Sequence, residues 1–230
     1  MAKSPDSRAF WDEAARTDLY WYIATRNTGD ATSFYASGSS ETDDLLAFCG
    51  IPPDEGQTIL EIGCGAGRMT RRLSELFGQV IALDVSGEMI KQAQDALADR
   101  HNVGYVHGSG YDLADLADQS VDIVFSYITL QHVPTSSNLL SYVRETARVL
   151  RPGGQAALQV RANGVVAASL DLAGHLGHAL GGRPTYRREW RGVRVAEALM
   201  LAAGRSRGAQ VRLRANGLRH SWLLMSAPRP

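Results

Sequence analysis

The chain has 230 residues, 44% of them apolar, so it can bury one large hydrophobic core. Its 24 basic and 24 acidic residues balance, which excludes the strong net charge of a general nucleic-acid binder or a disordered acidic chain. The charges are nevertheless divided, because acids outnumber bases over residues 1–150 and Arg outnumbers acids over residues 151–230.

The cysteines and the apolar runs bear on the cellular compartment. Cys49 and Cys64 do not have the spacing of a metal site, and Cys64 lies in a glycine-rich turn where disulfide geometry is unfavourable. The N-terminal segment has no apolar core of a signal peptide, and no apolar run approaches the roughly 20 residues of a membrane-spanning helix. We therefore expect a soluble, cytoplasmic protein without a metal or a membrane partner.

Residues 1–50 precede the first predicted strand and are rich in aromatic side chains. These side chains are Phe10, Trp11, Tyr20, Trp21, Tyr22, Phe34 and Tyr35. An N-terminal helical arm of this composition can cover the sheet or lie over a pocket as a lid, and both interpretations stay open.

Strand-like and helix-like segments alternate from Thr58 onward. Short apolar runs rich in β-branched residues predict strands covered on both faces, with the intervening helices as crossovers. The predicted strands are residues 58–62, 79–84, 103–107, 121–127 and 155–160, and the predicted helices are residues 69–77, 88–100 and 138–150. This order predicts an open α/β fold with a parallel sheet.

The last third of the chain departs from this alternation. The predicted helix 138–150 has Ser136 or Ser137 as its N-cap and ends at the segment RPGG, residues 151–154. Residues 193–203 predict a further helix, followed by strands at 210–214 and 221–226. The connection between these two strands is short, so the pair must be antiparallel.

The segment TILEIGCGAGRMT, residues 58–70, runs from a predicted strand into Gly63, Gly65 and Gly67. At the carboxyl edge of a parallel sheet, such a turn presents backbone N–H groups and a helix N-terminus to a ligand, and glycine admits the ligand close to the backbone. The spacing lacks the later glycine of the dinucleotide fingerprint, which disfavours a close phosphate contact.

Two acids accompany the glycine turn. Asp84 ends the next predicted strand, where a carboxylate can accept hydrogen bonds from both hydroxyls of a ribose. Glu61 comes just before the turn, and its charge favours a ligand with an ammonium or sulfonium group over a pyrophosphate. The alternative is that the glycines serve only a tight strand-to-helix turn.

Five segments in order carry a family pattern: ILEIGCGAGRMT, ALDVSGEMI, GSGYDL, VDIVFSYITLQHVP and RVLRPGG. Together they resemble the class I S-adenosylmethionine-dependent methyltransferases, specifically the bacterial small-molecule branch. The resemblance implies a Rossmann-like seven-stranded, mostly parallel sheet with helices on both faces and an antiparallel C-terminal hairpin. It implies one methyltransferase domain over 1–230, made of an N-terminal helical arm or lid (1–50), a cofactor-binding core (51–160), and substrate-side helices with the terminal hairpin (161–230).

The resemblance implies S-adenosyl-L-methionine as the cofactor and S-adenosyl-L-homocysteine as the product. It places Glu61, Gly63 and Gly65 at the methionine moiety, and Gly67 completes the turn. It places Asp84 at the ribose.

For the adenine end, the resemblance implies that Val85 and Met89 pack on the ring. Ser109 stands where many relatives have an Asp that contacts the adenine amino group. Recognition would then fall to the backbone around Gly110 and to the Ser109 hydroxyl, with Asp112 as a weaker candidate.

Ser126 and Tyr127 end the fourth predicted strand, beside the expected position of the methyl group. His132 follows shortly and is the best-placed general base for a hydroxyl acceptor, because the unperturbed imidazole pKa suits proton acceptance near neutrality. The alternative is that His132 only hydrogen-bonds the loop, or that Gln131 positions the cofactor.

Two further groups have less specific patterns. His175 and His178 are three residues apart without a nearby acid or cysteine, which favours surface or substrate-pocket histidines over a metal site. The cluster Arg183–Arg194 is interpreted as a solvated or subunit-facing strip, with an anionic acceptor as the alternative; it lacks the aromatic interleaving of a nucleic-acid site.

We therefore expect a methyltransferase acting on a small molecule, at a hydroxyl oxygen because of His132, as a monomer or homodimer. The alternatives are an N-methyltransferase of the same fold, a nicotinamide-dependent oxidoreductase and a non-catalytic cofactor-binding scaffold. The oxidoreductase is disfavoured by the missing glycine and by the absence of a Tyr-x-x-x-Lys pair after the fourth predicted strand.

Overall fold

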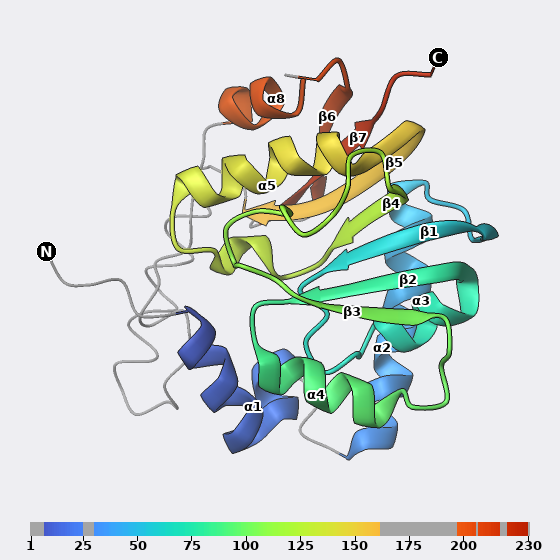
Figure 1. Ribbon diagram of the computed structural model, residues 1–230, viewed down its shortest axis with the longest axis vertical. Coiled ribbons are helices and arrows are strands. Elements are labelled where there is room, and N and C mark those ends of the chain that lie inside the picture. The colour runs from blue at the N-terminus through green and yellow to red at the C-terminus, as the bar shows by residue number, and fades with distance from the viewer. Residues whose placement is uncertain (1–6, 25–29, 162–196, 206, 217–219, 230) are drawn as a thin grey trace, which may run out of the picture.

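The computed structural model describes residues 7–24, 30–161, 197–205, 207–216 and 220–229 (Figure 1). Its strands are β1 (Asp54–Ile62), β2 (Phe77–Asp84), β3 (Val103–His107), β4 (Val121–Ser126), β5 (Leu150–Arg161), β6 (Gln210–Asn216) and β7 (His220–Ser226). Its helices are α1 (Ser7–Ile23), α2 (Ala31–Cys49), α3 (Thr70–Leu76), α4 (Gly87–Ala96), the 3-10 turn η1 (Leu130–His132), α5 (Ser136–Val149) and α8 (Glu197–Arg205). The candidates His175, His178 and Arg183–Arg194 lie outside the described residues.

The described strands form one seven-stranded sheet in the order β3-β2-β1-β4-β5-β7-β6. The pairs β1–β2, β1–β4, β2–β3 and β4–β5 are parallel. Strand β7 runs antiparallel to both β5 and β6. The expected mostly parallel sheet with an antiparallel C-terminal hairpin is thus confirmed.

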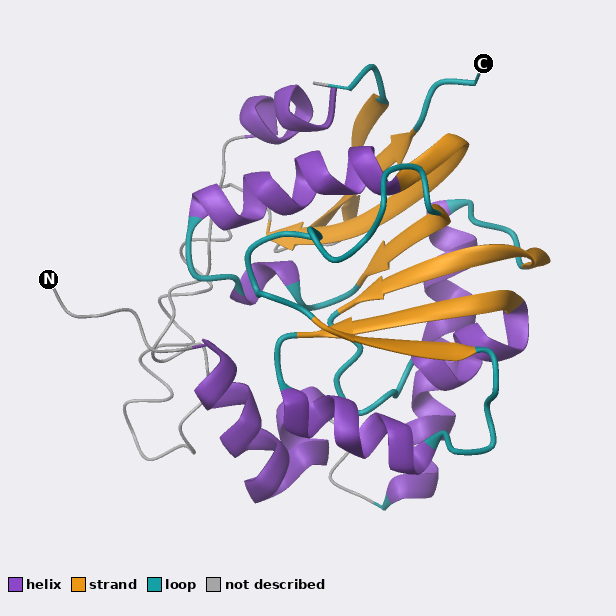
Figure 2. Cartoon of the chain, viewed as in Figure 1, coloured by secondary structure: helices purple, strands orange, loops and turns teal. Residues whose placement is uncertain are grey.

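Helices cover both faces of the sheet (Figure 2). Helices α5 and α8 pack on one face, and α2, α3 and α4 lie on the other (Figure 1). Adjacent residues of β1 show why both faces are apolar: Ile59 faces the core under α2 and α3, Leu60 faces the core under α5, and neither is exposed to solvent. The period of two along a strand sends neighbouring side chains to opposite faces.

The ends of α5 differ from the prediction. Its N-cap is Thr135, not Ser136 or Ser137, and the Thr135 side chain accepts a hydrogen bond from the N–H of Asn138. The N-cap position requires an extended backbone, which Thr135 has (φ −137°, ψ 160°), whereas both serines are already helical. The helix ends at Val149 and β5 begins at Leu150, so the segment RPGG lies inside the strand and not in a connecting loop.

The N-terminal arm consists of two helices with different neighbours. Helix α1 contains a break at Asp18 (φ −160°, ψ 73°) and lies against α4. Helix α2 is capped by Asp30, ends at Gly50 in a left-handed conformation (φ 74°) and packs with α3. Helix α2 agrees with the interpretation of the arm as a cover of the sheet, because it packs with α3. Helix α1 instead packs on α4.

Candidate functional site

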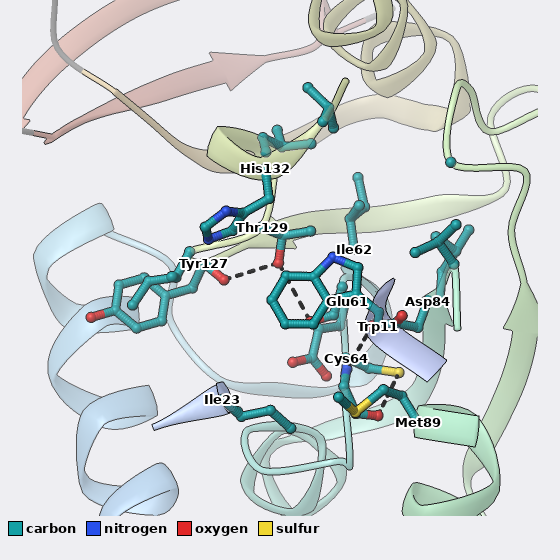
Figure 3. Close-up of a pocket in the computed structure, with 18 of the residues that line it drawn as sticks. Trp11, Ile23, Glu61, Ile62, Cys64, Asp84, Met89, Tyr127, Thr129 and His132 are labelled. Carbon is teal, nitrogen blue, oxygen red and sulfur yellow. Dashed lines mark hydrogen bonds between the residues drawn. The ribbon is translucent and has the colours of Figure 1, made fainter. Parts of the chain in front are cut away.

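A cavity opens at the carboxyl ends of β1, β2 and β4 (Figure 3). Strand β1 lies between β2 and β4, where the strand order reverses, and ligands of open α/β sheets bind in the crevice at such a switch point. The cavity measures about 1050 Å³ when its open mouth is included. The glycine turn, the end of β2, the loop after β4 and α1 all contribute to its wall.

The glycine turn after β1 depends on conformations that other residues rarely adopt. Gly63, Gly65 and Gly67 have φ values of 82°, 52° and 79°. A Cβ on Gly63 would lie 2.1 Å from Oγ1 of Thr129, and one on Gly67 would lie 2.8 Å from a methyl of Leu97. Gly63 and Gly65 line the cavity, whereas Gly67 turns away from it and allows α4 to pack closely.

Asp84 connects the turns after β1 and β2. Its Oδ2 accepts a hydrogen bond from the N–H of Gly65 at 2.8 Å, and its Oδ1 accepts one from the N–H of Ser86 at 2.9 Å. Burial raises the pKa of this carboxyl, and the two backbone hydrogen bonds oppose the rise. Each carboxylate oxygen has a second lone pair, so Asp84 can also accept hydrogen bonds from a ligand in the cavity.

Glu61 is a second buried acid on the cavity wall. Its side chain is 4% exposed, and its Oε2 accepts a hydrogen bond from the Thr70 hydroxyl at 2.6 Å. The pKa of Glu61 is raised to about 7, mainly by burial and in small part by the charge of Asp84, while the hydrogen bond from Thr70 and the charge of Arg68 oppose the rise. A ligand cation beside this carboxyl would favour its ionised form.

Arg68 also lines the cavity, and the sequence analysis did not identify it. Its Nη1 donates to Oε2 of Glu41 at 2.8 Å, and its Nη2 donates to the hydroxyl of Ser37 at 3.2 Å. Oε1 of Glu41 accepts a hydrogen bond from the Tyr127 hydroxyl at 2.6 Å. Helix α2 therefore connects the glycine turn to the end of β4. The sequence feature that could have pointed to Arg68 is its position directly after the third glycine of the turn, Gly67.

The loop after β4 has a strained backbone. Ile128 has φ 54°, in the left-handed region that β-branched residues rarely adopt, and its N–H donates to Oε1 of Gln159 at 3.2 Å. Its side chain is 41% exposed and lines the cavity. Backbone strain of this kind concentrates at functional sites, where the surrounding structure maintains it.

His132 lies on the cavity wall in η1, on the same loop. Its N–H donates to the carbonyl of Thr129 at 2.8 Å. The ring packs edge-on against Trp11, with 5.6 Å between the ring centres (Figure 3). Its Nε2 lies 3.2 Å from Nε2 of Gln131.

Helix α1 forms the outer wall of the cavity through Trp11, Tyr22 and Ile23. Its anchor is Asp12, whose Oδ1 accepts hydrogen bonds from the Ser86 hydroxyl at 2.6 Å and from the N–H of Glu88 at 3.3 Å. A carboxylate at this position also stabilises the N-terminus of α4 through the helix dipole. The arm thus reaches the cavity, and its opening as a lid stays a prediction.

The structure brings most of the expected site residues together on the cavity wall. These are Glu61, Gly63, Gly65, Asp84, Val85, Met89, Gly110, Tyr127 and His132. Gly67, Ser109 and Ser126 do not line it. Ser126 is fully buried at the end of β4, where its hydroxyl donates to the carbonyl of Ile62 in β1 at 3.1 Å. The Ser109 hydroxyl donates to Oδ1 of Asp112 at 2.9 Å and so closes a local turn.

Comparison with known proteins finds a family that resembles the central part of this chain. Residues 60–158 match the family described as a methyltransferase domain. The match includes the glycine turn, Asp84 and His132, and it ends before the C-terminal hairpin.

The names of two similar proteins indicate different methyl acceptors. The chain is 36% identical over 123 residues to a trans-aconitate 2-methyltransferase of Azoarcus sp., covering 52% of this chain and 44% of that protein. It is 32% identical over 157 residues to a ubiquinone biosynthesis O-methyltransferase of Xanthomonas campestris, covering 66% of this chain and 63% of that protein. The chain therefore spans less than two thirds of either relative.

A solved structure shows the same fold over nearly the whole chain. The N-methyltransferase NodS from Bradyrhizobium japonicum, in complex with S-adenosyl-L-homocysteine, superimposes with a TM-score of 0.63 and 15% identity. The superposition covers 97% of this chain and 99% of that chain. At this identity the comparison establishes the fold alone.

Metal and membrane features can be judged only for the described part of the chain. There, no group of three or more His, Cys, Asp and Glu side chains is arranged to hold a metal ion. None of its described helices is long and apolar enough to cross a membrane. Cys49 and Cys64 are both buried free thiols. The cytoplasmic location and the choice between monomer and homodimer stay predictions.

Proposed function

We propose that this domain binds S-adenosyl-L-methionine and transfers its methyl group to a small molecule. The observation that carries the proposal is the buried Asp84, held by the N–H of Gly65 at the edge of a cavity where the strand order of the sheet reverses. The family match over residues 60–158 supports the same activity.

The chemistry of the wall fits the cofactor from one end to the other. Asp84 offers carboxylate oxygens to ribose hydroxyls, and Val85 and Met89 offer an apolar surface to adenine. At the opposite end, Glu61 and Arg68 carry opposite charges, which suit the ammonium and carboxylate of an amino acid. Gly65 leaves this part of the wall without a side chain, where a Cβ would already approach Ile23 at 3.1 Å.

When bound, the cofactor supplies an already activated methyl group on its sulfonium. The protein then has to align the acceptor and exclude water. The acceptor side of the cavity is formed by uncharged rings and apolar groups, namely Trp11, Tyr22, Tyr127, Ile128, Val133 and Pro134. This composition supports a small acceptor with an apolar or planar portion.

We further propose a hydroxyl oxygen as the methylated atom, with His132 as the general base. His132 borders the cavity on its acceptor side, between Trp11 and the end of β4. The named relatives include an O-methyltransferase, and the superimposed structure is an N-methyltransferase. An amine acceptor that arrives deprotonated would need no base, so the role of His132 separates the two alternatives.

Calorimetry tests cofactor binding. The protein should bind S-adenosyl-L-methionine and S-adenosyl-L-homocysteine and should show no heat with NAD at equal concentration. Binding of NAD in place of both would overturn the proposal in favour of an oxidoreductase. Methyl transfer from labelled cofactor is then assayed against matched phenols, carboxylic acids and amines. Cofactor binding without transfer to any of them would favour a non-catalytic scaffold.

A further inference from the structure

A buried glutamine connects His132 to a second histidine from the other end of the chain. Nε2 of Gln131 lies 3.2 Å from Nε2 of His132, and Oε1 of Gln131 lies 2.8 Å from Nε2 of His220. Gln131 is 5% exposed and does not line the cavity, whereas His132 does. His220 is the first residue of β7, 89 positions further along the chain. The three side chains therefore link the loop after β4 to the C-terminal hairpin.

The chemistry of an amide sets the protonation of both rings. An amide side chain donates at its nitrogen and accepts at its oxygen, and a neutral imidazole carries a proton on only one of its two nitrogens. The two rings that share Gln131 must therefore differ at Nε2, one donating and the other accepting. With Oε1 toward His220, His220 carries its proton on Nε2, and His132 has a lone pair on Nε2 and its proton on Nδ1.

We propose that Gln131 and His220 are positioning residues that hold His132 with an unprotonated Nε2, the form that a general base requires. The inference rests on the proposed function, in which His132 accepts the proton of the acceptor hydroxyl. An imidazole nitrogen has a single lone pair, so the His132 ring has to leave Gln131 and turn Nε2 toward the cavity before it accepts the hydroxyl proton. Gln131 keeps its hydrogen bond to His220 during this exchange. The orientation of the amide is thus retained through the exchange.

The position of His220 explains why it can serve as the anchor. Strand β7 pairs with β5 over residues 155–161 and with β6 over residues 210–216, so its first residue is held from both sides. The family match ends at residue 158, before this hairpin. The C-terminal hairpin would therefore supply a part of the site that the matched segment does not contain.

Nitrogen NMR measures the histidine tautomers directly and does not require the methyl acceptor to be known. Protein labelled with ¹⁵N-histidine is measured near pH 8, where ordinary histidines are neutral. The wild type should show His132 with its proton on Nδ1 and His220 with its proton on Nε2. The signals of each histidine are assigned as those that disappear when that histidine is replaced by Asn. A wild-type spectrum with His132 protonated on Nε2 would overturn the proposal.

Two substitutions of Gln131 should act in different ways. Gln131→Leu removes both hydrogen bonds, so both rings should become mixtures of tautomers. Gln131→Glu offers only acceptor oxygens, so both rings should carry a proton on Nε2. The control is His101→Gln at an exposed site, which should leave both signals unmoved. Unchanged His132 and His220 signals in Gln131→Leu would also overturn the proposal.

Binding and turnover separate this inference from the proposed function. Gln131→Leu should bind S-adenosyl-L-homocysteine within about threefold of wild type, because Gln131 is not on the cavity wall. With an acceptor in hand, its kcat should fall by about tenfold to a hundredfold at unchanged KM, the cost of a misplacement of about 1 Å. Wild-type protein that does not bind S-adenosyl-L-homocysteine would refute the proposed function and leave the tautomer result standing. An unchanged kcat in Gln131→Leu would refute the positioning role alone.

Discussion

Glu61 and Asp84 are two buried acids at the same turn with different hydrogen-bond partners. Asp84 accepts hydrogen bonds from two backbone N–H groups, which partly replace the water it has lost. Glu61 accepts one from the Thr70 hydroxyl, and burial raises its pKa to about 7. Glu61 is therefore the acid whose charge state is most open to change by a bound cation near neutral pH.

The pKa of Glu61 predicts how stability depends on pH. Between about pH 4.5 and 7 the unfolded chain has released this proton and the folded chain retains it, so the free energy of unfolding should fall as the pH rises. The expected fall is about 3 kcal/mol, at roughly 1.4 kcal/mol per pKa unit, and Glu61→Gln should remove it. Urea unfolding at a series of pH values measures it. Glu55→Gln, at an exposed site on β1, is the control, and equal slopes in wild type and Glu61→Gln would contradict the assignment.

Asp84 should contribute to cofactor affinity. Asp84→Ala removes a charge-assisted pair of hydrogen bonds to the ribose and should weaken S-adenosyl-L-homocysteine binding by about 1–3 kcal/mol. Calorimetry measures the change, and circular dichroism confirms that the variant is folded. Asp99→Ala, which removes an exposed acid, should bind as wild type does. An unchanged dissociation constant in folded Asp84→Ala would remove Asp84 from the site.

His132 should act on turnover and not on cofactor affinity. His132→Ala should lower kcat by about 10²–10⁴-fold, the usual range for general acid–base catalysis, and bind S-adenosyl-L-homocysteine nearly as before. Near-normal turnover in a folded variant would leave proximity as the mechanism, as expected for an amine acceptor. Loss of cofactor affinity would instead make His132 a binding residue.

Among the helices, α1 is held over the cavity by an apolar cluster and by polar contacts with α4. Its apolar side packs on Met89 of α4 through Ala14 and Ala15, and Asp12 anchors it at the N-terminus of α4. The ion pair of Arg16 with Glu88 is largely exposed and contributes little. A segment with few buried contacts can open locally while the sheet stays intact.

Loss of the Asp12 anchor should loosen α1 selectively. Asp12→Ala removes two hydrogen bonds at the start of α4, worth about 1 kcal/mol. Hydrogen exchange should become about fivefold faster in α1 and stay unchanged in β1, and S-adenosyl-L-homocysteine should dissociate faster. Glu13→Ala, the neighbouring exposed acid, is the matched control. Equal exchange rates in wild type and Asp12→Ala would show that apolar packing alone holds the helix.

At the scale of the whole molecule, β7 joins the hairpin to the core and to the site. Trp222 in this strand is fully buried and stacks on Phe125 and Tyr127, with ring centres 5.7 and 6.0 Å apart. Its neighbours Leu223 and Met225 face the opposite core. The hairpin thus supports both layers and holds Tyr127, whose hydroxyl reaches Glu41.

Truncation of Trp222 should therefore destabilise the entire domain. Trp222→Ala should lower the free energy of unfolding by about 3–5 kcal/mol, the usual cost of emptying a large core site. Among the described residues its Nε1 has no hydrogen-bond partner, so Trp222→Phe loses no hydrogen bond there and should cost clearly less. Urea unfolding of the two variants measures the difference. A cost below 1 kcal/mol for Trp222→Ala would contradict the central role of β7.

Local patterns in the sequence were sufficient to predict the parallel core, the antiparallel hairpin, the glycine turn and the acid at the end of β2. These features depend on patterns between neighbours in the chain: apolar runs, turn residues and the length of a connection. Asp84 could be expected at the cavity because the carboxyl ends of parallel strands meet at one edge of the sheet. Local patterns were weaker for helix ends. Thr135, Ser136 and Ser137 all have a hydroxyl that can cap a helix. Only the backbone angles show that Thr135 is the N-cap, and the sequence does not predict those angles.

The distant residues that complete the site become known only once the helices and strands are packed together. Trp11 meets His132, Glu41 meets Tyr127 across 86 positions, and His220 meets Gln131 across 89 positions. Ser126, which was expected beside the methyl group, is buried at the end of β4 and donates to the carbonyl of Ile62. These contacts depend on how the helices and strands pack over the sheet. The periodicity of one segment predicts which of its side chains are buried, but it does not predict which distant residue each of them contacts.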